Sequence, residues 1–116
     1  MGKVNLTALG SKLTTAWVPL EVSQVDDYHV LLVLYESSYP PHYHNKDEYF
    51  FVLQGTVDIE IEGGGTVTLH EQEAMVVRAG LHHRSIARTP RALVLLLEAK
   101  DITYNPVVMV GQVAEE

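Results

Sequence analysis

The stretch Pro41-His42-Tyr43-His44-Asn45-Lys46-Asp47-Glu48-Tyr49-Phe50-Phe51-Val52-Leu53-Gln54-Gly55 joins a polar cluster to a long apolar run. Its two histidines, His42 and His44, share one face if the chain there is extended, because alternate side chains of a strand point the same way. Glu48 has the same parity and begins the apolar run. The short polar step between His44 and Glu48 lets the chain bend, so the carboxylate can reach the two imidazoles. Two imidazoles and a carboxylate are ligands typical of a divalent first-row metal.

The neighbours of this cluster favour a buried position for it. Two histidines on a solvated strand are common without any metal. Here the pair precedes a carboxylate and an apolar strand, so we expect it at the mouth of a core. A buried carboxylate needs a partner, and a metal ion is one. Phe50 and Val52 share the parity of Glu48 and are expected to line the interior.

A second segment, residues 78–85, holds another pair of histidines in the order Arg-Ala-Gly-Leu-His-His-Arg-Ser. Gly80 indicates a turn, and a strand is predicted after it. Adjacent side chains of a strand point to opposite faces, so at most one of His82 and His83 looks inward. An inward histidine would complete a set of three imidazoles and one carboxylate. The spacing alone does not choose between the two.

The rest of the chain consists of short apolar runs separated by turn signals, which predicts an all-β fold. No amphipathic helix of a dozen residues is evident, so a jelly roll or small barrel is favoured over a parallel fold with crossover helices. Pro19 indicates an edge or a bend in the first strand. The alternation in residues 57–62 predicts one face toward water. Strands are predicted over residues 15–22, 29–36, 48–53, 57–62, 66–69, 74–77, 83–88, 92–98 and 107–110, with one helical turn within residues 4–12.

Composition limits the classes of function. The chain has 116 residues, 47% hydrophobic and 20% charged, as expected for one soluble domain with a real core. It has no cysteine, which excludes disulfides and thiolate ligands, so a metal would be held by some of its six histidines and by carboxylates. A net charge of −7 argues against nucleic-acid binding. Without an apolar run long enough for a membrane span or a signal peptide, a cytoplasmic location is expected.

The spacing His42-x-His44-x3-Glu48-x6-Gly55 resembles the first motif of the cupin superfamily, G-x5-H-x-H-x3,4-E-x6-G. Residues 80–83 resemble the G-x2-H core of the second cupin motif, G-x5-P-x-G-x2-H-x3-N. The sequence departs from both motifs only at turn or packing positions, which leaves every ligand position in place. These departures are Glu36 and Gln72 at the two leading glycines, Arg78 at the proline and Ala87 at the final asparagine.

This resemblance implies a small single-domain cupin over residues 1–116, folded as a double-stranded β-helix, the cupin jelly-roll barrel. The first motif then occupies residues 42–55, and a degenerate second motif occupies residues 72–87. The resemblance also implies a divalent transition metal (iron, manganese, nickel, copper or zinc) with His82 facing away from it. The implied ligands are His42, His44, Glu48 and His83.

Three functions are compatible with such a site. The first is a metal-dependent enzyme of dioxygenase, decarboxylase or isomerase type, with a small-molecule substrate and catalytic residues that the motifs do not assign. The second is a protein that binds or senses a small molecule without turnover, and the third is a metal-free scaffold. Glu98, at the end of an apolar strand, is a candidate buried acid beside the site. His29 and His70 have no matching partner in the motifs and are interpreted as structural or surface residues.

The predicted strand over residues 48–53 is apolar on both faces. Tyr49, Phe51 and Leu53 lie on the face opposite to the one expected to line the barrel. Either a second sheet of the same chain or a second subunit must therefore cover them. Small cupins of the kind that the chain resembles are often dimers, so a homodimer is expected.

Overall fold

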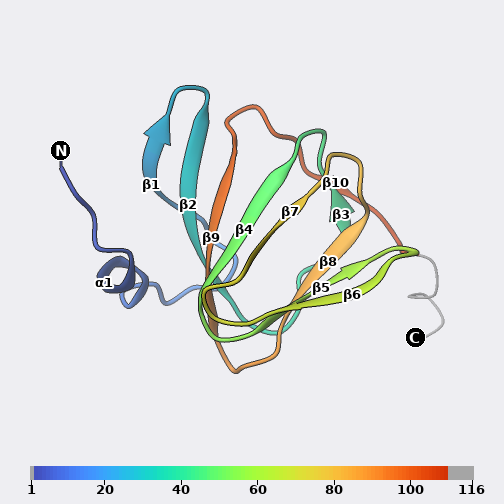
Figure 1. Ribbon diagram of the computed structural model, residues 1–116, viewed down its shortest axis with the longest axis horizontal. Coiled ribbons are helices and arrows are strands. Elements are labelled where there is room, and N and C mark those ends of the chain that lie inside the picture. Colours follow the sequence, from blue (N-terminus) through green and yellow to red (C-terminus); the bar gives the residue numbers. More distant parts are fainter. Residues whose placement is uncertain (1, 110–116) are drawn as a thin grey trace.

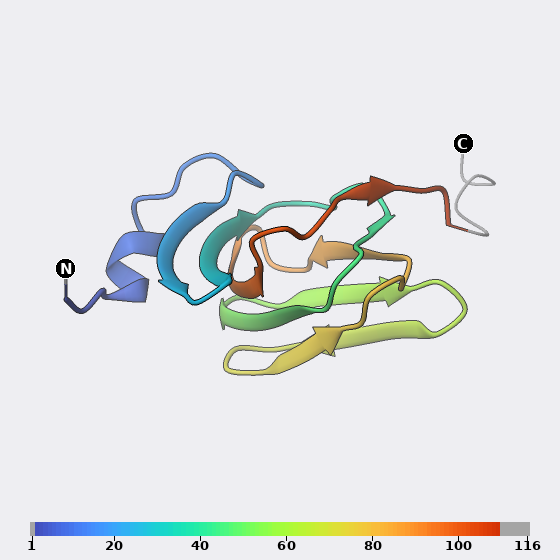
Figure 2. The same cartoon turned by 90° about the horizontal axis from the view of Figure 1, so that it is seen from above.

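A computed structural model describes residues 2–109 (Figure 1). The chain forms two antiparallel five-stranded sheets with strand orders β1-β2-β9-β4-β7 and β10-β3-β8-β5-β6. One short helix precedes them, and Figure 2 shows it at one end of the molecule beside β1 and β2. The all-β jelly roll predicted from the sequence is confirmed. The elements are α1 (Leu6–Gly10), β1 (Leu20–Val25), β2 (Tyr28–Tyr35), β3 (His42–Tyr43), β4 (Glu48–Gln54), β5 (Val57–Ile61), β6 (Gly65–Leu69), β7 (Ala74–Val77), β8 (His83–Ala87), β9 (Ala92–Ala99) and β10 (Asn105–Pro106).

The hydrophobic core lies between the two sheets and follows the alternation of the strands. On β4, Phe50 and Val52 are buried, whereas Tyr49 between Glu48 and Phe50 is exposed. The inward positions of β2 and β9 extend the same core, and β5 closes it from the other sheet. The cluster consists of Leu31, Val33, Tyr35, Phe50, Val52, Val57, Ile59, Leu69, Val77, Ala92, Val94 and Leu96.

The first strand begins later than predicted. The sequence favoured residues 15–22, but β1 spans Leu20–Val25. The reason lies at Trp17, whose φ of 67° turns the chain and whose backbone N–H donates to the carbonyl of Leu34 at 2.9 Å. Pro19 consequently precedes the strand. β1 is an edge strand, as the proline indicated, with a bulge between Glu21 and Ser23.

The last strand also differs from the prediction. The sequence placed it at residues 107–110, but β10 is Asn105–Pro106, residues 107–109 form no strand, and Val110 lies outside the described residues. β10 pairs with β3, with Asn105 opposite Tyr43 and Pro106 opposite His42. The prediction rested on the apolar valines of residues 107–110. The strand instead forms two residues earlier, where the chain can pair with β3, a segment that contains a histidine.

The outer face of β5 does not simply look at water. Asp58 is buried, accepts a hydrogen bond from Thr68 Oγ1 at 2.6 Å and pairs with Arg88 Nε at 2.6 Å. Glu60 pairs with Arg84 Nε at 2.9 Å. Cross-strand ion pairs therefore cover the acidic residues that the alternation had placed in solvent. Within residues 2–109, no helix is long and apolar enough to cross a membrane.

Candidate metal centre

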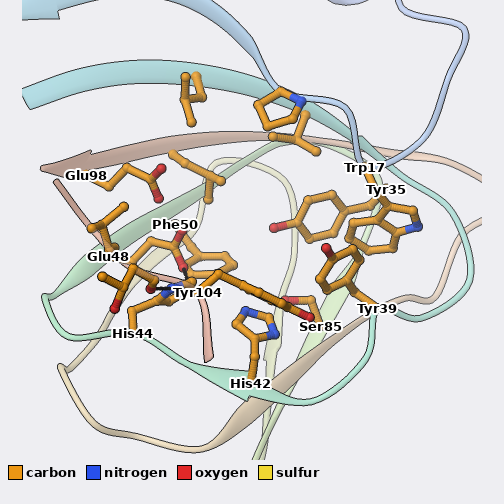
Figure 3. A pocket seen from close by; sticks show the side chains of 16 residues that line it. Trp17, Tyr35, Tyr39, His42, His44, Glu48, Phe50, Ser85, Glu98 and Tyr104 are labelled. Carbon is orange, nitrogen blue, oxygen red and sulfur yellow. Dashed lines mark hydrogen bonds and ion pairs between the residues drawn. The ribbon is translucent and has the colours of Figure 1, made fainter. Parts of the chain in front are cut away.

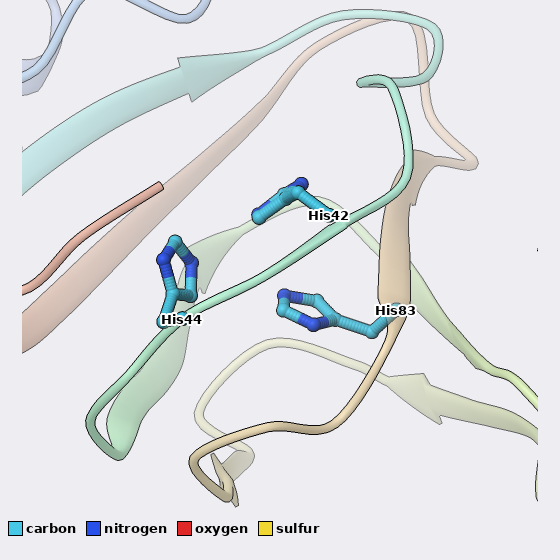
Figure 4. Close-up of side chains that lie close together, drawn as sticks. All are labelled: His42, His44 and His83. Carbon is cyan, nitrogen blue, oxygen red and sulfur yellow. The ribbon is translucent and has the colours of Figure 1, made fainter. Parts of the chain in front are cut away.

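Three histidines from two neighbouring strands converge at one end of the core. His42 lies on β3, His44 follows that strand, and His83 begins β8 directly opposite His42. One ring nitrogen of each lies within 4.8 Å of those of the other two. Figure 4 shows the three imidazoles pointing toward one another. All three residues are buried, with His83 completely inaccessible.

Hydrogen bonds to the backbone fix the tautomer of each ring. In all three cases Nδ1 lies within 3 Å of a carbonyl oxygen, which only accepts, so Nδ1 carries the proton and Nε2 presents its lone pair. Such a bond on the second nitrogen is the usual way in which a metal-binding histidine is oriented. The carbonyls belong to Pro40 for His42 (2.8 Å), Thr103 for His44 (2.7 Å) and Leu81 for His83 (2.9 Å).

Two of the inward nitrogens make no hydrogen bond in the part of the chain described by the structure, although that of His44 lies 3.3 Å from a carboxylate oxygen of Glu48. Nε2 of His44 and Nε2 of His83 are buried and accept no hydrogen bond. Buried polar atoms are rarely left unsatisfied, because their desolvation is then uncompensated. A cation between the rings would satisfy both nitrogens. The donor set and its geometry therefore fit a divalent transition metal.

The charge states of two of the rings, His42 and His83, also suit a cation. Burial, together with the neighbouring His83 and His44, lowers the pKa of His42 to about 4. Burial also lowers the pKa of His83, so both rings are neutral near pH 7 and keep a free lone pair. Burial acts in the same direction on His44, but the carboxylate of Glu48 outweighs it and raises the pKa of this ring.

Glu48 lies beside the three histidines but is not a member of the tight group. Its Oε1 is 3.3 Å from Nε2 of His44, and its side chain is buried. The structure thus brings the carboxylate to the same end of the core as the histidines, in contact with one of them.

The structure separates the two adjacent histidines of the second segment. His83 points into the core, whereas the ring of His82 stacks on Tyr43 with centroids 5.1 Å apart and planes tilted by 20°. Nδ1 of His82 lies 2.8 Å from Oε1 of Glu62. This is the orientation that the cupin resemblance implied and that spacing alone left open.

A second buried carboxyl group, Glu98, adjoins the site. Glu98 on β9 lies directly opposite Glu48 on β4, and the two side chains share a hydrogen bond. Burial and the neighbouring Glu48 raise the pKa of Glu98 to about 9, so it is the protonated partner. Glu98 also lies 3.3 Å from Nε2 of His29, whose Nδ1 is 3.0 Å from Glu21. His29 therefore has a structural role as predicted, and its two partners are Glu21 and Glu98.

A cavity of about 300 Å³ opens beside the histidines. Figure 3 shows two unlike ends, with His44, Glu48 and Glu98 on one side and Trp17, Tyr35 and Tyr39 on the other. The sequence patterns assigned no role to Trp17 or Tyr104. The lining residues are Trp17, Pro19, Leu31, Val33, Tyr35, Tyr39, His42, His44, Glu48, Phe50, Ser85, Leu96, Glu98, Ile102, Thr103 and Tyr104.

Residues 101–107, which we call the C-terminal strap, cross the ligand-bearing segment. The backbone N–H of Thr103 donates to Oδ1 of Asn45 at 2.7 Å. The ring of Tyr104 lies against His42 with centroids 4.8 Å apart. β10 within the strap pairs with β3. The strap therefore both orients a candidate ligand and forms one wall of the cavity.

Comparisons with known proteins agree with this architecture. Residues 30–98 match a family model described as a cupin domain. The uncharacterized protein YdbB of Bacillus subtilis (strain 168) is 28% identical over 82 residues, which cover 70% of this chain and 73% of that protein. A cupin-2 domain protein from Shewanella frigidimarina superposes with a TM-score of 0.79 at 26% identity, covering 84% of this chain and 94% of the other. The hydroquinone 1,2-dioxygenase PnpCD, solved with Fe3+, shares the fold with a TM-score of 0.78 at 16% identity, covering 86% of this chain and 33% of that one.

Proposed function

The chain belongs to the cupin domain family, and from this premise we propose that it binds a divalent transition metal and, next to it, a small molecule. The observation that carries the proposal is the pattern of bonds at the three histidines. Each Nδ1 is held by a backbone carbonyl. Two of the three Nε2 atoms are buried without a hydrogen bond, and one of these, on His44, lies 3.3 Å from a carboxylate oxygen of Glu48. A metal ion satisfies all three rings at once.

The proposed ligands are Nε2 of His42, His44 and His83, with a carboxylate oxygen of Glu48 as the fourth. Imidazole and carboxylate suit iron, manganese, nickel, copper or zinc. When bound, such an ion supplies Lewis-acid or redox chemistry to a substrate group beside it. The cavity supplies the rest: apolar and aromatic walls that exclude water, and the strap, which covers one side.

The proposal is tested by elemental mass spectrometry of untagged protein. We expect about one transition metal ion per chain, and its loss from the His42→Ala/His44→Ala double variant. His70→Ala is the matched control, because His70 is exposed and remote from the cavity. Circular dichroism checks that each variant is folded. Full metal occupancy in the double variant, or none in the wild type after reconstitution, would contradict the proposal.

The same four ligands would serve a dioxygenase, a decarboxylase, an isomerase or a binding protein. The three enzymes would each convert the small molecule into a product, whereas a binding protein would leave it unchanged. Once a ligand is identified, incubation of metal-loaded protein with it and mass analysis of the mixture separates turnover from binding. A product that disappears in the double variant would identify an enzyme, and an unchanged ligand would identify a binding protein.

We also propose that the outer face of the first sheet pairs with a second copy of the chain. Two rows of directly opposed residues lie on this face, Val76–Tyr49–Leu97 and Ala74–Phe51–Leu95. Tyr49, Val76 and Leu97 are each 37% exposed. All six residues are uncharged, so two copies of this face meet without the repulsion that a net charge of −7 creates elsewhere.

Light scattering coupled to size exclusion tests the dimer. Val76→Glu places a charge on the proposed interface and is expected to produce monomers. Val67→Glu is the matched control, because Val67 is also 37% exposed but lies on β6 of the other sheet. A monomeric wild type, or equal effects of the two substitutions, would contradict the proposed interface.

A further inference from the structure

We propose that the cavity takes a small planar aromatic molecule, with its ring against the aromatic end and no charged group at that end. The inference deepens the proposed function, on which it rests for the small-molecule role of the cavity. The aromatic end consists of Trp17, Tyr35 and Tyr39, none of which is a candidate metal ligand. Recognition of the ring is therefore measurable whether or not a metal is bound.

A continuous set of rings runs from the aromatic end to the candidate ligand His42. Trp17 packs on Tyr35 with centroids 4.3 Å apart and planes tilted by 38°, and on Tyr39 at 4.9 Å. Tyr39 meets Tyr104 edge-on at 5.9 Å, and Tyr104 meets His42 at 4.8 Å. Aromatic rings prefer offset or edge-to-face neighbours at such distances. All of these residues line the cavity, so a flat ring that enters it can contact them.

Trp17 is held in an unusual conformation at this wall. Its φ of 67° lies in the left-handed region, which bulky residues rarely adopt. The backbone N–H donates to the carbonyl of Leu34 at 2.9 Å, and the indole Nε1–H donates to the carbonyl of Glu36 at 3.1 Å. Both bonds fix the indole in place, so it lines the cavity as a rigid surface. Backbone strain of this kind concentrates at ligand-binding positions.

The charged residues of the cavity lining and the volume of the cavity limit the ligand to a small ring without a charge at the aromatic end. In the described part of the chain, the lining includes no lysine or arginine, and its only carboxyl groups, Glu48 and Glu98, lie at the opposite end. An anionic group at the aromatic end would meet Trp17, Tyr35 and Tyr39 without a cationic side chain in the lining to pair with it, at the cost of its hydration. A cavity of about 300 Å³ suits a single small ring.

Titration calorimetry with three para-substituted six-membered rings tests the proposal. The probes are 4-methylphenol, the saturated 4-methylcyclohexanol and the doubly anionic terephthalate, which carries a charge at either end. We expect saturable binding of 4-methylphenol, and at least tenfold weaker binding of the other two. Trp17 is the only tryptophan in the chain, so its fluorescence should change on binding and place the ligand at this wall. Equal binding of 4-methylcyclohexanol or terephthalate would overturn the proposal.

Two variants locate the binding. Trp17→Leu is expected to weaken 4-methylphenol binding about tenfold, whereas Trp17→Phe keeps a ring and most of the affinity. Tyr104 is 45% exposed, so Tyr104→Leu removes a ring with little risk to folding and is expected to weaken binding as well. Unchanged affinity in both leucine variants would overturn the proposal.

Measurements on metal-free and zinc-loaded protein keep the two proposals apart. Metal occupancy without 4-methylphenol binding would overturn the ring assignment alone. Binding of 4-methylphenol by protein that takes up no metal would support the ring assignment and contradict the metal site.

Discussion

Nδ1 of His44 lies 2.7 Å from the carbonyl oxygen of Thr103, a residue 59 positions further along the chain. The backbone N–H of Thr103 is in turn held by Oδ1 of Asn45, also at 2.7 Å. His44 is therefore oriented by a loop that lies outside the first cupin motif, residues 42–55. The C-terminal strap and the candidate ligand form one hydrogen-bonded unit, and disturbing either should affect the other.

Replacing Asn45 by alanine tests this coupling. Without the Asn45 side chain the strap loses an anchor, and the carbonyl that orients His44 is less well placed. We expect metal affinity to fall by about tenfold, the low end of the effect of removing a group behind a metal ligand. Metal-competition titration against a chromogenic chelator measures it. Asn5→Ala is the control, because it removes a comparable bond from an asparagine Oδ1 to a backbone N–H, far from the site. Equal affinities in the two variants would refute the coupling.

The adjacent histidines of β8 allow a paired test of the ligand assignment. His83→Asn is expected to reduce metal occupancy to a small fraction, because it removes a buried inward nitrogen. His82→Asn is expected to keep the metal, because this ring stacks on Tyr43 and bonds to Glu62. Elemental analysis of both untagged proteins gives the answer. Loss of metal from the His82 variant alone would reverse the assignment.

The sequence pattern was enough to predict β4 and β8, which bear Glu48 and His83, but it predicted no strand at β3, which bears His42. It placed β4 within one residue of its observed bounds and separated Phe50 and Val52 from Tyr49. Parity placed His42 and His44 on one face, and the structure brings them together with His83. The assignment of these residues and Glu48 as metal ligands stays a prediction, as does the cytoplasmic location.

What the sequence did not reveal depends on pairings between distant segments. Trp17 lies 25 positions before His42. Its backbone is left-handed, but the residue is not a glycine, so the sequence shows no sign of a turn there. Tyr104 and the strap reach the site because β10 pairs with β3, and such a two-residue strand has no periodicity to detect. The contact between Glu48 and Glu98 follows from the register of β4 and β9. Local patterns do not encode register between strands 50 residues apart.

The stability of the fold should depend on pH through Asp58. Burial disfavours its ionisation, but the hydrogen bonds from Thr68 and Arg88 prevail and hold the pKa of this carboxyl below its ordinary value of 3.8. The charged form is therefore favoured in the folded state. Its contribution is complete above the unfolded pKa and is lost as pH falls through the folded pKa.

Asp58→Asn isolates this contribution. We expect a loss of about 1 kcal/mol in the free energy of unfolding near neutral pH, and a smaller loss at pH 3, which lies below the ordinary pKa of 3.8. Urea denaturation of wild type and variant at both pH values measures the difference. Asp101→Asn is the control, because this side chain is 73% exposed and its pair with Lys46 should contribute little. A difference that is the same at both pH values would contradict the role given to the charge.

Gly55, the last residue of the first motif, should be required for packing as well as for its turn. Its φ is 86°, and a Cβ atom there would lie 2.5 Å from Oγ1 of Thr89 and 2.8 Å from the carbonyl oxygen of Arg91. Gly55→Ala therefore combines a left-handed alanine with a clash, and we expect it to lower the free energy of unfolding by about 2–4 kcal/mol. Gly63 has a φ of 75° with open space around it, so Gly63→Ala should cost only about 1 kcal/mol. Urea denaturation of the two variants separates the cost of the clash from the cost of the left-handed backbone. Equal losses in the free energy of unfolding would show that the close approach to Thr89 and Arg91 does not affect stability.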